Sequence, residues 1–178
     1  MIFCFVGAHG TGKSTILEAL KNKLDIPVIE GNSRKYIKNY EVDRNDIIQN
    51  LVAEDLYTQI YKKILSNQNA IFSRSPVDTF SYSIVNNLSP YMQELWKERI
   101  KDLSQNIVYF YTPIEFDLID DGVRGSDREH QNEVDLTMSN TLKELSLRFH
   151  VVIGTADNRL KTVEELIKSY TNGFSAKR

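Results

Sequence analysis

The sequence predicts an α/β fold in which a mostly parallel sheet carries helices on both faces. Short apolar runs of strand length recur along the 178 residues, and segments with a helical spacing of apolar residues separate them. Ile2–Val6 is continuously apolar, as expected for a strand buried on both faces. Strands that alternate with helices favour parallel pairing, because a parallel connection crosses back over the sheet. We therefore expect a three-layer sandwich in one domain.

The elements are expected in the following order. Apolar runs predict five strands: Ile2–Val6, Ile26–Ile29, Ala70–Phe72, Ile107–Tyr111 and Val151–Ile153. Helical spacing and capping residues predict the helices Lys13–Leu24, Asn32 or Ser33 to Tyr40, Asp46–Leu65, one beginning at Pro76, Tyr91–Leu103, Glu133–Leu147 and Val163–Tyr170. Ile114–Glu129 has little periodicity and many charges, which predicts a loop, and a lid would span residues from about 114 to 130.

The composition is that of a globular protein with a slightly acidic balance. Apolar residues make up 41% of the chain, enough to form a core. The net charge of −2 lacks the basic excess typical of proteins that bind DNA or RNA. The single cysteine, Cys4, excludes an internal disulfide framework and a cysteine-rich zinc site. Without a membrane-length apolar run or a signal peptide before the first glycine, we expect a cytoplasmic protein with no membrane partner.

A glycine-rich motif lies between the first expected strand and the first expected helix. Gly7-Ala8-His9-Gly10-Thr11-Gly12-Lys13-Ser14 matches G-x-x-x-x-G-K-S/T at every defined position, and Thr15 follows. Glycines let the backbone curl so that successive N–H groups hold phosphate oxygens, and the helix directs its positive N-terminal end at the same anion. In this P-loop, Lys13 would reach the β- and γ-phosphates and the Ser14 hydroxyl would bind Mg²⁺. The motif predicts that this segment binds ATP with Mg²⁺.

Other residues favour a small-molecule kinase among the P-loop classes. The two strands Ala70–Phe72 and Ile107–Tyr111 do not end in the acid that motor and AAA-type ATPases use to hold magnesium through water. No N-K-x-D motif, the guanine reader of signalling GTPases, follows a late strand. Arg74 follows a strand and so lies at the carboxyl edge of the sheet, where such folds bind ligands. Arg124 and Arg128 fall in the predicted lid loop, where they would meet the moving phosphoryl group or be solvated loop charges.

Several motifs in order give the chain a resemblance to a kinase family. They are the P-loop, Glu30 with Ser33-Arg34-Lys35-Tyr36, Ser73-Arg74-Ser75-Pro76-Val77-Asp78 with Tyr82, Asp121-Gly122-Val123-Arg124, and a weaker Gly154-Thr155 with Arg159. The chain resembles the P-loop nucleoside and nucleotide kinases. It is most similar to an AAA-like group around the nicotinamide riboside kinase domain of the bacterial NAD regulator, with deoxynucleoside and thymidylate kinases as relatives.

The resemblance implies roles for residues near the phosphates. Lys13, Arg74 and Arg124 would be catalytic and would stabilise charge on the transferring phosphoryl group, with Arg128 as a second lid candidate. Arg159 follows the last strand, where the relatives enclose the adenine, so the resemblance implies a contact with ATP there.

The resemblance also implies an acceptor site. Glu30 would accept the proton of the acceptor hydroxyl or bind a sugar hydroxyl, or it would pair with Arg34 or Lys35. Arg34 would bind the substrate. Asp78 would contact substrate or orient an arginine four residues earlier, and Tyr82, one turn further on the same face, would line the acceptor pocket or the core.

Ser73 departs from the family pattern, because relatives carry Asp or Glu immediately before the strand-end arginine. Glu30, Asp120 or Asp121 would take over the role of this acid, or the acceptor differs, or turnover is slow. The leading hypothesis is a kinase that uses ATP and Mg²⁺ to phosphorylate a nucleoside, nucleotide or similar small molecule.

Two alternatives remain open. The acceptor could be a nucleotide within DNA or RNA, for which Arg34, Lys35, Lys38 and Arg44 would contact phosphates, although the acidic balance disfavours it. The protein could also be a nucleotide-binding regulatory NTPase with little turnover, which Ser73 supports. Monomer and homodimer are both compatible with the sequence.

Overall fold

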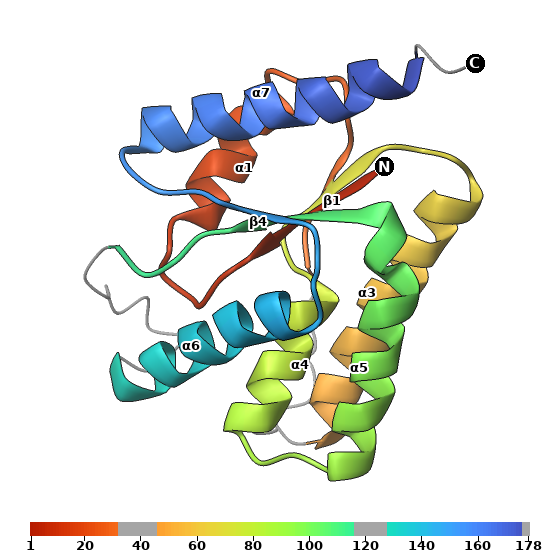
Figure 1. Cartoon of the computed structure of the whole chain (residues 1–178), viewed down its shortest axis with the longest axis vertical. Helices are drawn as coiled ribbons and strands as arrows, with labels where there is room; N and C mark the ends of the chain where they lie inside the picture. Colours follow the sequence, from red (N-terminus) through yellow and green to blue (C-terminus); the bar gives the residue numbers. More distant parts are fainter. Residues whose placement is uncertain (32–45, 116–127, 176–178) are drawn as a thin grey trace.

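The computed structural model describes residues 1–31, 46–115 and 128–175, and it has the expected α/β architecture (Figure 1). Five strands form one sheet in the order β2-β3-β1-β4-β5, and every pairing is parallel. The strands are β1 (Ile2–Val6), β2 (Val28–Ile29), β3 (Ala70–Phe72), β4 (Ile107–Tyr111) and β5 (Phe149–Val151). The predicted fold class is therefore confirmed.

Helices cover both faces of the sheet. Figure 1 shows α1 and α7 on one side and α3, α4, α5 and α6 on the other. Their bounds are α1 Lys13–Lys21, α3 Asp46–Leu65, α4 Pro76–Val85, α5 Pro90–Leu103 followed by the 3₁₀ turn Ser104–Asn106, α6 Arg128–Glu144 and α7 Ala156–Ser175. Within the described ranges, no helix is long and apolar enough to cross a membrane.

The side chains of β1 alternate between two hydrophobic cores. Phe3 and Phe5 pack with α1 and α7, whereas Cys4 and Val6 pack in the core formed with α3 to α6. All five residues of β1 are buried, since helices cover both faces of the central strand. This is why the strand reads as a continuous apolar run.

Several predicted boundaries agree with the structure and others are wrong. Ile2–Val6, Asp46–Leu65, Ala70–Phe72 and Ile107–Tyr111 are confirmed. The helix predicted at Pro76 is also confirmed, and it begins with a capping box in which the Ser75 hydroxyl accepts from the Asp78 backbone N–H. The helix expected before Tyr40 lies outside the described residues.

Helix α6 begins at Arg128, whereas the apolar spacing predicted a start at Glu133. Its first turns carry Arg, Glu and Gln, which are good helix formers, but they lack the apolar spacing that marks a helix in a sequence. Arg128 therefore lies on a helix and not in the preceding loop.

The C-terminal elements also begin earlier than predicted. The last strand is Phe149–Val151 and not Val151–Ile153, because its register with β4 pairs Tyr109 with Phe149. The final helix starts at Ala156 and not at Val163. The Thr155 hydroxyl accepts the Asn158 backbone N–H at 3.3 Å, as a residue before a helix often does.

Candidate phosphate-binding site

The predicted site residues that the structure describes gather at the carboxyl edge of the sheet. The P-loop follows β1, Arg74 follows β3 and Thr112 follows β4. β1 pairs directly with both β3 and β4, so the three strand ends are neighbours. This is the edge at which parallel α/β sheets bind ligands.

Glycines shape the P-loop backbone. Gly10 and Gly12 have φ angles of 75° and 81°, in the left-handed region that glycine adopts without strain. A Cβ at Gly7 would lie 2.5 Å from both the carbonyl oxygen and the hydroxyl oxygen of Thr112. The loop therefore passes against the end of β4 at a distance that leaves no room for a side chain.

Lys13 lies inside the curl of the loop. Its Nζ donates to the carbonyl oxygens of Gly7 and Ala8 at 2.7 and 2.6 Å, and to the Thr11 hydroxyl at 3.1 Å. The side chain is buried, while Ser14 and Thr15 are exposed on the first turn of α1. A positive charge and the N-terminus of a helix thus lie together, the arrangement that binds phosphate.

A hydrogen bond between two threonine hydroxyls connects the P-loop to the end of β4. The hydroxyl oxygens of Thr11 and Thr112 lie 3.0 Å apart. The Thr112 hydroxyl also donates to the carbonyl oxygen of Val6 at 3.1 Å, which joins the ends of β1 and β4. The sequence analysis did not single out Thr112, because only the strand order brings it next to the P-loop.

The side chain of Arg159, which is only 1% exposed, binds the backbone of the P-loop. Its Nη1 donates to the carbonyl oxygen of Thr11 at 2.7 Å, and its Nε donates to that of Gly154 at 2.9 Å. Its Nη2 forms an ion pair with Glu115, whose carboxylate also accepts the Gly154 N–H. The contact with adenine implied by the resemblance stays a prediction, and the position of the guanidinium indicates a supporting role.

Arg74 lies beside Asp78 at the start of α4. Arg74 Nη1 and Asp78 Oδ1 are 3.3 Å apart, and Asp78 Oδ2 accepts from the Ser75 backbone N–H and hydroxyl at 2.9 and 2.6 Å. Burial lowers the pKa of the Arg74 guanidinium, but Asp78 and Tyr82 outweigh burial and leave the pKa raised. The structure thus brings together Arg74, Asp78 and Tyr82 and pairs Asp78 with the arginine, while a contact of Asp78 with substrate stays a prediction.

Tyr82 connects this group to the P-loop. Its hydroxyl oxygen lies 3.4 Å from His9 Nδ1, and its ring centroid lies 6.2 Å from that of His130 on α6. Tyr82 is 7% exposed and belongs to a hydrophobic core. Tyr82 therefore has a core position beside the P-loop, and its expected place in an acceptor pocket stays a prediction.

The amide of Gln131 links α6 to the P-loop. Its Nε2 donates to the His9 carbonyl oxygen at 2.6 Å, and its Oε1 accepts from Arg128 Nη1 at 3.0 Å. The sequence analysis missed Gln131, because nothing in the local pattern distinguishes a buried glutamine from an exposed one. Arg124 and Arg34 lie outside the described residues.

Glu30 forms an ion pair with Lys21, which was not among its predicted partners. It is an exposed residue whose Oε1 lies 2.6 Å from Lys21 Nζ. Next to it, the Gly31 backbone N–H donates to the Ser73 hydroxyl at 2.7 Å. The Ser73 hydroxyl thus joins the ends of β2 and β3.

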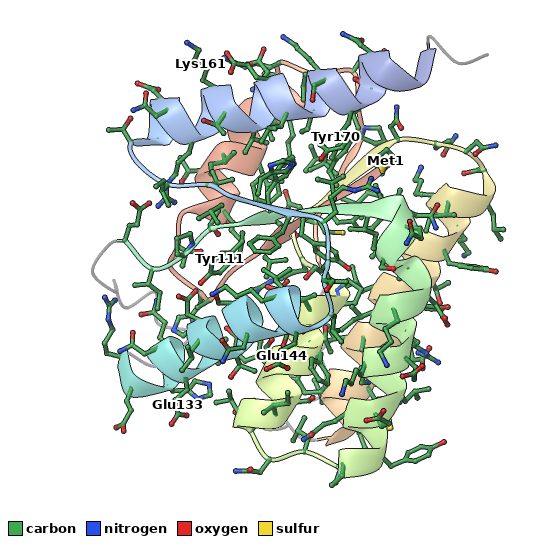
Figure 2. The ribbon with its side chains drawn as sticks, viewed as in Figure 1. Met1, Tyr111, Glu133, Glu144, Lys161 and Tyr170 are labelled. Carbon is green, nitrogen blue, oxygen red and sulfur yellow. The ribbon has the colours of Figure 1, made fainter. Side chains whose placement is uncertain are left out.

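A carboxylate that the sequence analysis missed, Asp135 on α6, lies near the end of β4. Burial raises the pKa of Asp135, while hydrogen bonds from Tyr111 and the Ile114 backbone, and the charge of Lys13, act in the opposite direction. Its Oδ1 is buried and accepts no hydrogen bond in the described structure. Figure 2 shows Tyr111 in the layer between the sheet and α6. Asp135 therefore contributes to the electrostatic environment of Lys13, although α6 and α1 cover opposite faces of the sheet.

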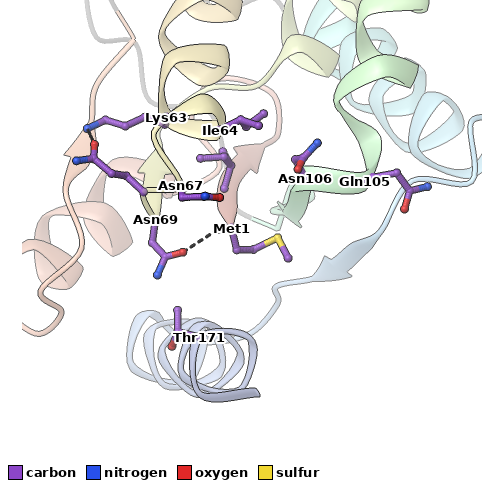
Figure 3. A pocket seen from close by; sticks show the side chains of 10 residues that line it. Met1, Lys63, Ile64, Asn67, Asn69, Gln105, Asn106 and Thr171 are labelled. Carbon is purple, nitrogen blue, oxygen red and sulfur yellow. Dashed lines mark hydrogen bonds between the residues drawn. The ribbon is translucent and has the colours of Figure 1, made fainter. Parts of the chain in front are cut away.

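A cavity lies at the other end of β1, remote from the P-loop (Figure 3). It has a volume of about 320 Å³, and its lining includes the carboxamides of Asn67, Asn69, Gln105 and Asn106. The Met1 amino group donates to Asn69 Oδ1 at 2.7 Å across it. Because it opens at the amino edge of the sheet, this cavity is separate from the candidate phosphate-binding site.

Several solved structures share the fold. Deoxyadenosine kinase from M. mycoides matches with a TM-score of 0.68 and 17% identity, over 95% of this chain and 100% of that chain. Thymidylate kinase from Ehrlichia chaffeensis matches with a TM-score of 0.66 and 15% identity, over 94% and 98% of the two chains. NadR protein in complex with NR matches with a TM-score of 0.76 and 19% identity over 96% of this chain and 51% of its own length.

These similarities confirm the expected resemblance at the level of the fold. The chain has no significant sequence match among curated proteins. A family model described as an AAA domain matches residues 2–159, from β1 to the arginine that supports the P-loop. The chain therefore belongs to the AAA domain family of P-loop proteins.

Proposed function

We propose that the protein is a phosphotransferase that moves the γ-phosphate of ATP to a nucleoside, a nucleotide or a related small acceptor. The observation that carries this proposal is the contact between two groups of residues at one sheet edge. Lys13 lies inside the P-loop, and Arg74 with Asp78 and Tyr82 lies at the end of the neighbouring strand β3. The pair His9 and Tyr82, 3.4 Å apart, joins the two groups.

The P-loop supplies the ATP side of this site. Lys13 donates to the carbonyl oxygens of Gly7 and Ala8, and it would exchange these partners for phosphate oxygens when nucleotide binds. The backbone N–H groups from Gly7 to Thr15 and the N-terminus of α1 surround the same oxygens. Arg159 and Thr112 hold the loop in the required shape.

Magnesium would be bound beside Lys13. Ser14 is exposed on the first turn of α1, and a hydroxyl there fits an ion that prefers oxygen ligands and keeps several of its waters. The remaining ligands would be nucleotide oxygens and water. Magnesium would neutralise charge on the phosphates, and the protein would position the oxygens.

Arginines on the acceptor side would stabilise the transferring group. Arg74 is oriented by the buried carboxylate of Asp78, and Arg128 projects from the first turn of α6. A positioned arginine is worth roughly a thousandfold or more in phosphoryl transfer. Two structural neighbours, deoxyadenosine kinase and thymidylate kinase, support a nucleoside or nucleotide acceptor by analogy of fold.

A second candidate function is a nucleotide-binding regulator with little turnover. One observation favours it: the Ser73 hydroxyl, at the position where the resemblance implies an acid, accepts from the Gly31 N–H. In this case the P-loop would bind ATP without rapid transfer.

A screen with ATP labelled in its γ-phosphate tests the proposal. The purified protein is incubated with Mg²⁺ and a panel of nucleosides, nucleotides and oligonucleotides, and label on an acceptor identifies a kinase and its substrate class. Lys13→Ala should abolish the transfer, whereas Lys161→Ala, on the outer side of α7 (Figure 2), should leave it unchanged. ATP binding without label on any acceptor would favour the regulator, and label on oligonucleotides alone would favour a polynucleotide kinase.

A further inference from the structure

The amide of Gln131 is buried in a place where it must be hydrogen-bonded at both ends. The residue is 1% exposed, and a buried amide without partners would cost about 1–3 kcal/mol. Its Nε2 donates to the His9 carbonyl oxygen at 2.6 Å and its Oε1 accepts from Arg128 Nη1 at 3.0 Å. A single side chain therefore connects the P-loop backbone to an arginine.

The two ends of this connection belong to different parts of the site. His9 precedes Gly10, whose left-handed backbone begins the curl around Lys13. Arg128 is the first residue of α6, three positions before Gln131 and on the same face of the helix. An unrestrained arginine side chain has many rotamers, and a hydrogen bond to an amide that is itself bound to the P-loop restricts those of Arg128.

Gln131 also holds the first turn of α6 in place against the P-loop. Val134 and Met138, on later turns of the helix, are completely buried in the core with Tyr111. The apolar contacts hold the body of α6 against the sheet, and the amide holds its first turn against the P-loop. A displacement of about 1 Å in such a site can cost a hundredfold in rate, so the register of this turn matters to catalysis.

We propose that Gln131 is a positioning residue that sets the Arg128 guanidinium relative to the P-loop for phosphoryl transfer. This inference rests on the proposed function. Gln131 acts through its two hydrogen bonds and does not itself contact the reacting phosphate. We expect the loss of either bond to loosen the placement of the Arg128 guanidinium relative to the P-loop.

The test uses variants that break the two bonds differently. Gln131→Met keeps the length and volume of the side chain but makes neither bond. Gln131→Glu keeps an acceptor for Arg128 but, when ionised, cannot donate to the His9 carbonyl oxygen. Arg128→Met removes the positioned group itself. Thr141→Val is the matched control, because Thr141 is also a buried polar residue of α6 and its hydroxyl donates only within the helix, to the Thr137 carbonyl at 2.8 Å.

Turnover and KM for ATP are measured with the acceptor identified in the labelling screen, and the melting temperature is measured for each variant. We expect Gln131→Met and Arg128→Met each to lower kcat by about tenfold or more, with KM for ATP changed by less than about threefold. The double variant should be no slower than the slower single variant, because both changes remove the same interaction. Thr141→Val should keep the kcat of the unmodified protein.

Multiplied effects of Gln131→Met and Arg128→Met in the double variant, or an unchanged kcat in Gln131→Met, would overturn the positioning role. A lower melting temperature with unchanged kcat would also overturn it, since a residue that only packs has that effect. If Gln131→Met does not fold, Gln131→Glu carries the test, with the same expected loss of kcat. Failure of the proposed function is distinguished by the unmodified protein, which would then label no acceptor.

Discussion

Arg159→Met removes the guanidinium that donates a hydrogen bond to the P-loop backbone at Thr11. The substitution keeps a long side chain in the same space but deletes the hydrogen bonds to the carbonyl oxygens of Thr11 and Gly154 and the ion pair with Glu115. Arg159 and Thr11 are each 1% exposed, so water cannot replace the donor at the Thr11 carbonyl oxygen, whereas Gly154 is exposed and water can reach its carbonyl oxygen. The change therefore affects folding and the shape of the loop together.

The size of the effect follows from these partners. Removing one member of a buried charge pair typically costs about 3–5 kcal/mol. Glu115 is 31% exposed and water takes over part of its solvation, so we expect the lower end, about 3 kcal/mol of the free energy of unfolding. For a chain of this size, such a loss lowers the melting temperature by about 6–12 °C.

Denaturant unfolding gives the loss of stability, and calorimetric titration gives the affinity for ATP and for other nucleoside triphosphates. Arg148→Met is the matched control, because Arg148 is exposed, and it should stay within about 0.5 kcal/mol of the unmodified protein. Glu115→Gln should cost less than Arg159→Met, since an amide oxygen still accepts from the guanidinium. A stability loss below about 1 kcal/mol, together with a weakened preference for adenine over other bases, would refute the supporting role and favour a base contact.

Three further changes test other parts of the account. Gly7→Ala places a Cβ 2.5 Å from two oxygens of Thr112, so it should destabilise the protein by about 1–3 kcal/mol and weaken ATP binding; binding as tight as before would contradict the close approach. Ser75→Ala removes the cap of α4 and a donor to Asp78, which should cost about 1 kcal/mol in denaturant unfolding, and a neutral result would contradict the capping box. Burial lowers the pKa of His150, so the unfolded chain binds the proton more readily and stability is lost as the pH falls from the ordinary value of 6.5 through the lowered pKa. His150→Gln should therefore flatten the fall of the melting temperature between about pH 7.5 and pH 5, and an equally steep fall would show that other groups cause it.

Local patterns predicted the parts of the site that are local in the chain. The P-loop was predicted from its spacing and flanking elements, because a strand, a glycine turn and a helix are formed by consecutive residues. The pairing of Arg74 with Asp78 was among the predicted alternatives, since residues four apart share a helix face. The apolar runs predicted the central strands for the same reason.

Contacts between distant segments could not be predicted in this way. Gln131 binds the His9 carbonyl oxygen across 122 positions, and Arg159 binds that of Thr11 across 148. Asp135 reaches Tyr111 only because α6 packs over the end of β4. Such partners depend on the order of strands in the sheet and on the placement of helices over it, which a single sequence does not encode in any local pattern.

The most direct test of the central claim is the transfer of labelled γ-phosphate from ATP to a nucleoside or nucleotide, compared between the unmodified protein and Lys13→Ala. The account predicts label on at least one small acceptor with the unmodified protein. It predicts none with Lys13→Ala, whose fold is verified by an unchanged cooperative unfolding transition. Equal transfer by a folded Lys13→Ala variant, or no transfer by the unmodified protein to any acceptor, would contradict the account.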